Sequence, residues 1–281
     1  MQIVQDDSAQ IFLDNSAELL YRDEPTNSLL IGLCESMRIS EPKIAPILLR
    51  FIDGGKTVSA AIQTLPMNLV LTYSNTGQVA VLANYLNKIN ASFPGVVGPA
   101  VESELFANAW SGLTGKPNRL GMGQKIYKIE QVEFLSGVAG EFRSAEKRDL
   151  DLVTEWVIAF AKESLPIGPR GEQHWKDFAE RSIQNKTAYL WTIDDVPVSM
   201  AHTGRPTKNG VSISGVYTPL NERKKGYASG VVSHLSQTML DSGKRFCVLY
   251  TDLANLNSNK IYQNIGYREV SDSKHFLFSE I

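Results

Sequence analysis

Residues 211–229 combine a short strand, a basic loop with a glycine, and the start of a helix. The stretch VSISGVYTP (Val211–Pro219) is followed closely by NERKKGYAS (Asn221–Ser229). The amides of such a loop and the positive end of the helix dipole attract an anion, and glycine lets the backbone approach it closely. The pattern therefore predicts a loop that holds a phosphate group.

A second segment, NLNSNKIYQNIGY (Asn255–Tyr267), places Tyr262 one helix further along the chain. A phenol within hydrogen-bond distance of a reacting atom can donate a proton to it. A phosphate-rich cofactor with a reacting end would use both segments. Packing of a buried aromatic ring beneath the cofactor is the alternative interpretation of Tyr262.

Together these segments resemble the GCN5-related N-acetyltransferase (GNAT) superfamily. The family motif R/Q-x-x-G-x-G/A corresponds to Arg223-Lys224-Lys225-Gly226-Tyr227-Ala228, and the strand end before it to Val216-Tyr217-Thr218-Pro219. The later motif N-x-x-S/A-x-x-L/I-Y-x-x-x-G-F/Y corresponds to Asn255, Ser258, Ile261, Tyr262, Gly266 and Tyr267. The resemblance covers about residues 141–281. It implies the GNAT fold, an α/β (α+β) architecture with a mixed central sheet flanked by helices.

The resemblance also implies acetyl-CoA as the cofactor. Amides from Lys224 to Ser229 would bind its pyrophosphate, Arg223 would shape the loop, and Lys224 and Lys225 would add positive charge. Backbone groups of the preceding strand would pair with the pantetheine arm. The residues expected to bind the cofactor are Val216, Thr218, Arg223, Lys224, Lys225, Gly226, Tyr227, Ala228, Ser229, Asn255 and Ser258.

Two further features of these segments are expected from the same resemblance. The amide of Val216 would stabilise the oxyanion that develops on the acetyl carbonyl, and Gly215 fits a β-bulge beside it. Asn255 would contact the pantetheine amides, while Asn257 would cap the helix that contains Ser258.

The proton chemistry is only partly assigned by the sequence. Tyr262 would act as general acid toward the CoA thiolate that leaves. Many members of the family use a glutamate on the motif strand as general base, but this strand offers Ser212 and Ser214 instead. His202 on the preceding strand is a weak candidate, and a chain of water molecules is an equal alternative. We expect His234 and His275 to be structural.

The leading functional hypothesis is acetyl transfer to the primary amine of a small molecule by direct attack in a ternary complex. No Cys–His or Ser–His pairing near the motif indicates a covalent acyl-enzyme. The loop Leu165–Gly171 and the helix with His174 and Trp175 would line the acceptor site, with plain packing the alternative for Trp175. Transfer to a protein or peptide amine, and non-catalytic binding of acyl-CoA, remain open as alternatives.

Composition narrows the class of protein. The chain has 281 residues, 43% of them hydrophobic. Its formal net charge is −2, which argues against nucleic acid as a general partner.

Cys34 and Cys247 fall in different predicted domains, and we expect neither a disulfide nor a metal site. The start of the sequence lacks an apolar signal region and no apolar run has membrane-spanning length, so we expect a cytoplasmic protein without a membrane partner. The oligomeric state is not predicted.

The chain is expected to form two domains, residues 1–135 and 141–281, joined by the small residues 136–140. The second follows the order β-α-α-β-β-β-α-β-α-β-β, and the first shows a similar order. The first domain is then either a degenerate copy of the same fold or an unrelated α/β domain. Its strand Asn68–Tyr73 is followed by Ser74–Gly77 without a basic glycine loop, so we expect no cofactor there.

Overall fold

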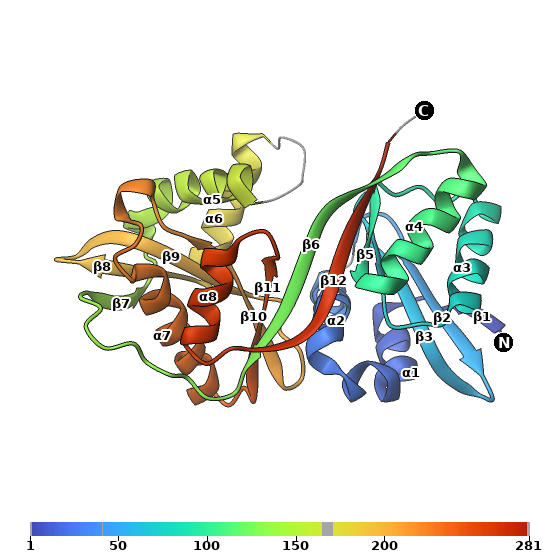
Figure 1. Cartoon of the computed structure of the whole chain (residues 1–281), viewed down its shortest axis with the longest axis horizontal. Coiled ribbons are helices and arrows are strands. Elements are labelled where there is room, and N and C mark those ends of the chain that lie inside the picture. The colour runs from blue at the N-terminus through green and yellow to red at the C-terminus, as the bar shows by residue number, and fades with distance from the viewer. Residues whose placement is uncertain (1, 41, 165–170, 280–281) are drawn as a thin grey trace. The chain divides into compact units, whose positions relative to one another are not determined.

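The computed structural model describes residues 2–40, 42–164 and 171–279 of the chain (Figure 1). It divides into two compact units. The first unit contains Met1–Ile126, Arg205–Thr207 and Val270–Ile281, and the second contains Tyr127–Gly204 and Lys208–Glu269. Within the described ranges, no helix is both long and apolar enough to cross a lipid bilayer.

The first unit is built on a mixed sheet. Strands β1 to β4 pair antiparallel with their neighbours, β4 pairs parallel with β5, and β12 (Arg268–Phe278) pairs antiparallel with β5. Its remaining elements in chain order are β1 (Gln2–Gln5), α1 (Ala9–Arg22), α2 (Glu24–Ile39), β2 (Ile47–Asp53), β3 (Lys56–Gln63), β4 (Leu69–Leu71), α3 (Thr76–Lys88), β5 (Gly95–Pro99), α4 (Ala100–Thr114) and β6 (Asn118–Ile129).

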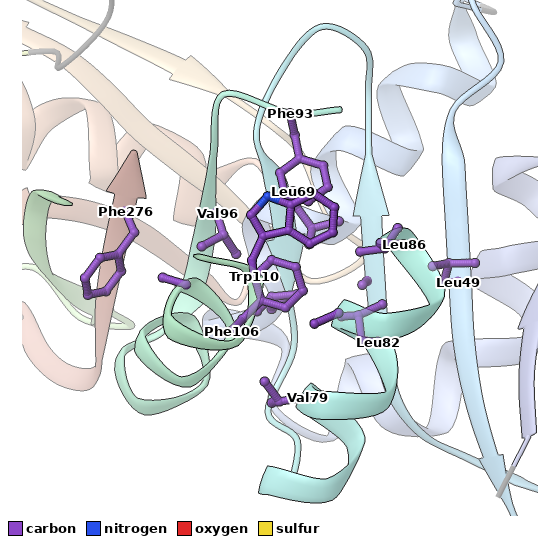
Figure 2. Close-up of a cluster of buried hydrophobic side chains, with 14 of the residues drawn as sticks. Leu49, Leu69, Val79, Leu82, Leu86, Phe93, Val96, Phe106, Trp110 and Phe276 are labelled. Carbon is purple, nitrogen blue, oxygen red and sulfur yellow. The ribbon is translucent and has the colours of Figure 1, made fainter. Parts of the chain in front are cut away.

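Apolar residues on both faces of this sheet hold helices on both sides. Side chains alternate between the two faces along each strand, so one strand can serve two clusters. One cluster packs α1 and α2 against residues such as Leu48 and Ile62. The other packs α3 and α4 against the opposite face, where the rings of Phe93, Phe106 and Trp110 meet (Figure 2).

The second unit repeats this plan. Its strands pair in the order β7-β8-β9-β10-β11, antiparallel except for the parallel pair β10–β11. Clusters of buried residues hold α5 and α6 on one face and α7 and α8 on the other. The elements are β7 (Glu141–Ser144), α5 (Leu150–Ser164), α6 (Glu172–Gln184), β8 (Ala188–Ile193), β9 (Val196–Gly204), β10 (Gly210–Tyr217), α7 (Tyr227–Asp241), β11 (Phe246–Asp252) and α8 (Leu256–Asn264).

The two units share one order of elements. In each, a strand is followed by two helices, three strands, a helix, a strand, a helix and a long strand. The parallel pair also occupies the same place in both, since β4–β5 corresponds to β10–β11. The predicted α/β class with mixed sheets flanked by helices is confirmed. The order favours a second copy of the same fold in the first half over an unrelated domain.

The division between the units differs from the expected boundary at residues 136–140. The first unit ends at Ile126, inside β6, and it regains the chain from Val270 onward. The physical reason is strand pairing, because Ser273 to Leu277 of β12 lie opposite Pro99 to Gly95 of β5. Residues 130–140 thus belong to the second unit and do not link two separate domains.

Several element boundaries also differ from the sequence-based expectations. Strand β1 was not expected, since QIVQ is short and half polar, and it forms by pairing with β2. The two strands that end the expected order of the second half are one continuous strand, β12. Its polar middle, Ser271-Asp272-Ser273, stays extended because Ser273 and the residues after it pair with β5.

Candidate active site

The candidate site begins where β10 and β11 separate. The strands pair in parallel at three positions, from Gly210 opposite Phe246 to Ser212 opposite Val248. β10 continues to Tyr217, yet no further pairing with β11 occurs among the residues that the structure describes. The backbone of Ile213–Tyr217 on this side is therefore free to bind an extended ligand arm, as an added strand does.

A β-bulge lies in the separated part of β10. Ser214 is opposite His202 and Tyr217 is opposite Met200, so three steps along β10 face two along β9. Gly215 has φ +58°, a left-handed conformation that strains other residues. The predicted bulge at Gly215 is confirmed. A bulge leaves one residue without its ladder bonds, which agrees with the expected free amide of Val216.

Arg223 ties the loop after β10 together. Its Nε donates to the Thr218 carbonyl oxygen at 2.8 Å, and its Nη2 donates to Glu163 of α5 at 2.7 Å. The expected shaping role of Arg223 therefore agrees with its contacts. Lys225 is bound to Glu222 at 3.0 Å, whereas Lys224 makes no ion pair within the described part of the chain. Lys224 thus supplies the least compensated positive charge of the loop.

Helix α7 starts with its first amides open. Gly226 is the N-cap, with φ +86°, and α7 has no side-chain cap. The first backbone bond of the helix runs from the Gly230 amide to the Gly226 carbonyl at 2.9 Å. The amides of Tyr227, Ala228 and Ser229 precede it. Amides in this position, with the helix dipole behind them, form a site for an anion.

Val138 is a neighbour of this loop that the sequence did not indicate. A Cβ added to Gly226 would lie 3.0 Å from Val138 Cγ2. The segment is fixed by Trp191, whose Nε1 donates to the Ala139 carbonyl at 2.9 Å. Residues 136–140, expected to be a flexible linker, thus form one wall of the loop. No local pattern reveals this contact, because it joins residues about 90 positions apart.

Asn255, not Asn257, caps helix α8. The Asn255 Oδ1 accepts from the Ser258 amide at 3.1 Å, and Asn257 lies inside the helix. This corrects the expected division of roles, because the cap uses the carbonyl oxygen of Asn255 and leaves its NH₂ group for a ligand. Asn259, which was not predicted, donates to the Asp252 carbonyl at 3.2 Å and keeps a buried Oδ1 without a partner among the described residues.

Tyr262 lies on the inner face of α8, 9% exposed, in the apolar cluster of the second unit. Its ring meets that of Tyr267 edge-on at 6.0 Å. Burial raises the pKa of Tyr262 to about 12, so the phenol stays protonated near neutral pH. Val216 and Tyr227 pack against the same cluster. The fold therefore brings together residues from the three predicted segments.

Comparisons with known proteins agree with this geometry. Residues 196–277 match the protein-family model described as FR47-like protein. The chain has no significant match among curated proteins. A GCN5-related N-acetyltransferase from Sphaerobacter thermophilus aligns over 98% of this chain and 95% of its own, with a TM-score of 0.63 and 15% identity.

Two other solved structures align over almost the full length. An acetyltransferase of the GNAT family from Colwellia psychrerythraea covers 99% of both chains, with a TM-score of 0.58 and 11% identity. A tandem GNAT protein described as belonging to the clavulanic acid biosynthesis pathway covers 99% of this chain and 98% of its own, with a TM-score of 0.55 and 10% identity.

The chain has the GNAT fold. The likeness extends over both halves, and one of the aligned structures is itself a tandem GNAT protein. The predicted resemblance of the second half is thereby confirmed. The first half, which carries no motif, is GNAT-like in its order of elements as well.

His202 is the remaining titratable candidate near the GNAT motif strand. It is 3% exposed and packs 5.5 Å from the Phe178 ring, and neither ring nitrogen makes a hydrogen bond to a described side chain. Burial lowers its pKa to about 4, and the nearby backbone of Gly215 offsets this only in part. At neutral pH the imidazole is uncharged, and a pKa this low makes it a poor general base.

The other residues named for the site fall elsewhere. Trp175 packs in the apolar cluster under α5 and α6, which agrees with the packing interpretation. His234 contacts the Gly230 carbonyl at 2.9 Å, and His275 contacts Asn68 at 2.9 Å in the first unit, so both have the structural contacts expected of them. Residues 165–170 of the expected acceptor loop lie outside the described residues, and Gly171 is the N-cap of α6.

Proposed function

We propose that the second unit is an acetyl-CoA-dependent N-acetyltransferase that transfers an acetyl group to the primary amine of a small molecule. The observation that carries this proposal is the separation of β10 from β11 beyond Ser212 and Val248, directly before an uncapped helix. An open strand edge next to an anion site fits one ligand with an amide-containing arm and a phosphate group.

The residues of the loop fit coenzyme A by two independent features. Gly226 has no side chain, and even a Cβ at this position would touch Val138. The loop therefore has little room for a larger residue here. The amides of the first turn of α7 lack a side-chain cap, so a pyrophosphate can take the place of one. Lys224 adds a positive charge that is not neutralised by a described neighbour.

The bound cofactor supplies an activated acetyl group as a thioester. The amide of Val216 would donate its hydrogen to the thioester carbonyl oxygen, where negative charge would develop as the amine attacks. Tyr262 would donate its hydroxyl proton to the leaving sulfur, since its phenol is protonated at neutral pH. The attacking amine would lose one proton to solvent, and solvent would return one proton to Tyr262. The protons are then balanced over the transfer.

Direct transfer is supported by the state of the cysteines. Cys247 in β11 and Cys34 in α2 are both fully buried, and burial raises the pKa of each thiol to about 12. A thiol in this state is a poor nucleophile, because the thiolate is the reacting form. An acyl-enzyme on either cysteine is therefore not proposed.

Calorimetric titration of acetyl-CoA into the purified protein tests the cofactor site. We expect a stoichiometry near one, and loss of binding in Gly226→Glu, which places bulk and negative charge in the phosphate site. Gly243→Glu is the matched control, because Gly243 follows the other end of α7, also has a positive φ of +98°, and meets nothing within 4 Å. Retained binding in Gly226→Glu, or no binding by the wild type, would overturn the proposal.

The acceptor class is tested separately by two assays on the same enzyme. A panel of small primary amines is incubated with acetyl-CoA, and release of free thiol is followed. In parallel, mixed peptides are incubated and their acetylation is read by mass spectrometry. Transfer to amines with no peptide acetylation supports the proposal. The reverse result assigns a protein or peptide acceptor instead, and cofactor binding without either product leaves a binding module.

A further inference from the structure

His202 and Ser214 form a pair at the mouth of the candidate site. They lie directly opposite each other across β9 and β10. Residues in this relation share one face of the sheet, with Cβ atoms about 4.5–5.5 Å apart. Ser214 is exposed, whereas His202 is buried. The sequence did not indicate this Ser–His pairing, which joins a hydroxyl in solvent to an imidazole inside the protein. Because burial lowers the pKa of His202 to about 4, the imidazole is a poor base to activate the serine as a nucleophile.

The imidazole has unused hydrogen-bonding capacity. Both ring nitrogens are buried; the backbone of Gly215 interacts with the imidazole, and at least one of its two nitrogens has no partner among the described residues. Buried polar groups are nearly always satisfied, so such an exception calls for a ligand, a water molecule or a functional role. Because the ring is uncharged near neutral pH, one of its nitrogens is a bare acceptor. It can therefore receive a proton of a neighbouring hydroxyl.

Ser214 is the serine on these strands that is free to provide that hydroxyl. Ser212 Oγ already donates to the Gly204 carbonyl at 2.7 Å, and Ser199 Oγ contacts Tyr217 and Thr218. Ser214 makes no hydrogen bond within the described ranges. Since its side chain is exposed, its χ1 rotamer is not fixed by packing.

The location connects the pair to the reacting atoms. Ser214 immediately precedes the bulge, and the Val216 amide follows two residues later. The imidazole fills the space beside Gly215, since a Cβ added there would lie 2.8 Å from His202 Nδ1. A ligand at the open edge of β10 thus meets the hydroxyl of Ser214 on one side and the bulge on the other.

We propose that Ser214 is the residue that binds the attacking amine, with His202 as the residue that positions it. The imidazole accepts the hydroxyl hydrogen of Ser214, which turns a lone pair of Oγ toward an N–H of the amine. The ligand class is a primary amine, because a hydroxyl whose hydrogen is engaged presents only an acceptor and so binds an N–H donor. This inference rests on the proposed transferase function and adds the site of its second substrate.

The first test is kinetic and uses an amine that the panel identifies. We expect Ser214→Ala and His202→Leu each to lower kcat/KM for the amine roughly tenfold, the effect of one hydrogen bond, with no change in acetyl-CoA affinity by calorimetry. The double variant should lose about as much as either single one, because the two act as a unit. Ser212→Ala is the matched control and should keep the wild-type value for the amine.

Variants at His202 separate positioning from structure. His202→Gln places an amide near the position of Nε2 and His202→Asn near that of Nδ1, so one of them should restore part of the activity that His202→Leu loses. His202→Leu should also keep or raise Tm, because it replaces an unsatisfied buried polar group with an apolar one. Parallel loss of Tm and activity, with no rescue, would assign His202 a structural role only.

A measurement without substrate keeps the inference independent of the proposed activity. The ¹⁵N resonances of the His202 ring are recorded in the wild type, in Ser214→Ala and in Ser212→Ala. We expect a change in the Ser214→Ala spectrum alone. Identical His202 resonances in all three proteins would overturn the pair, even if the enzyme acetylates amines. A wild type that acetylates no amine, with the Ser214-dependent change present, would instead count against the proposed function.

Discussion

The parallel strand pair is open in one unit and closed in the other. In the second unit, β10 and β11 stop pairing after Ser212 and Val248. In the first unit, β4 and β5 remain in contact beyond their last pair, since a Cβ added to Gly98 would lie 2.8 Å from the Leu71 carbonyl oxygen. The same topology therefore offers a free strand edge in one case and none in the other.

The helices that follow β4 and β10 also differ, in whether their first amides are bound by the protein itself. Helix α3 of the first unit begins with a capping box, in which Asn75 and Gln78 exchange side-chain to backbone bonds of 2.9 Å in both directions. Helix α7 of the second unit has no side-chain cap. One copy satisfies its helix amides with its own residues, and the other leaves them to a ligand.

The strand before each helix completes the contrast. β4 pairs with β3 without a register shift, and Thr72 continues the ladder with a bond from its amide to the Ala60 carbonyl at 3.0 Å. β10 carries the bulge at Gly215. A ligand site in this protein therefore depends more on backbone groups that are left unpaired than on the order of the elements.

Acid should reveal the largest difference between the histidines of the two units. Burial lowers the pKa of His202 to about 4, from an ordinary value near 6.5, so the unfolded chain takes up a proton that the folded one does not. Both forms are neutral above about pH 6.5, and the free energy of unfolding then falls by about 3 kcal/mol as the pH drops to about 4. Urea unfolding at about pH 7 and about pH 4.5 measures this loss.

The variant His202→Leu should abolish that part of the acid sensitivity. His275 of the first unit, whose pKa is lowered first by burial and then by Arg119, keeps its bond to Asn68 and gives the comparison. An unchanged pH dependence in His202→Leu would show that the imidazole is not held uncharged in the folded protein.

Replacing Tyr262 with Phe leaves α8 without a hydroxyl at this position of its inner face, as in α4 of the first unit. The inner face of α4 carries Phe106 and Trp110, which have no hydroxyl. We expect Tyr262→Phe to lower kcat about 100-fold, because the leaving sulfur loses its proton donor. Affinity for acetyl-CoA and Tm should stay near the wild-type values, since no described residue is hydrogen-bonded to the Tyr262 hydroxyl.

Steady-state kinetics with calorimetry of the same preparation check this prediction. Tyr267→Phe is the control, because it removes a buried hydroxyl that bonds Ser236 at 2.8 Å in the same cluster. Full kcat in Tyr262→Phe would leave packing as the role of this tyrosine.

The smallest expected effect comes from removing the side-chain cap at the start of α3. Asn75→Ala removes the side-chain cap of α3 and should cost about 1 kcal/mol of unfolding free energy. The stoichiometry of acetyl-CoA should remain near one, because β4 and β5 still offer no free edge. Denaturant unfolding and calorimetry measure both quantities, and a second binding site in this variant would break the comparison.

Local patterns in the sequence account for much of the fold. The motif at Arg223–Ala228 marked the loop that lies before α7, and the expected order of elements in the second half includes α5 and α7. Glycine at position 215 indicated the bulge. These features depend on neighbours within a few residues, so a single sequence contains them.

The features that sequence reasoning missed depend on distant partners. The wall that Val138 makes at Gly226, the closure of β4 on β5 at Gly98, and the pairing of β12 with β5 all join residues far apart in the chain. Asn257 was the expected cap of α8, and the path of the chain into the helix gives that role to Asn255 instead. Nothing local in the sequence encodes these choices.

The pairing of β12 with β5 sets an order of events during synthesis. Residues 95–99 leave the ribosome early, whereas the strand that pairs with them, Ser273–Leu277, is made near the end of synthesis. The edge of β5 is therefore uncovered while the chain is still being made. An uncovered strand edge is a template for unwanted pairing. The half without a cofactor motif is thus completed only by residues that follow the motif, so neither half can be inherited or lost as a simple continuous piece.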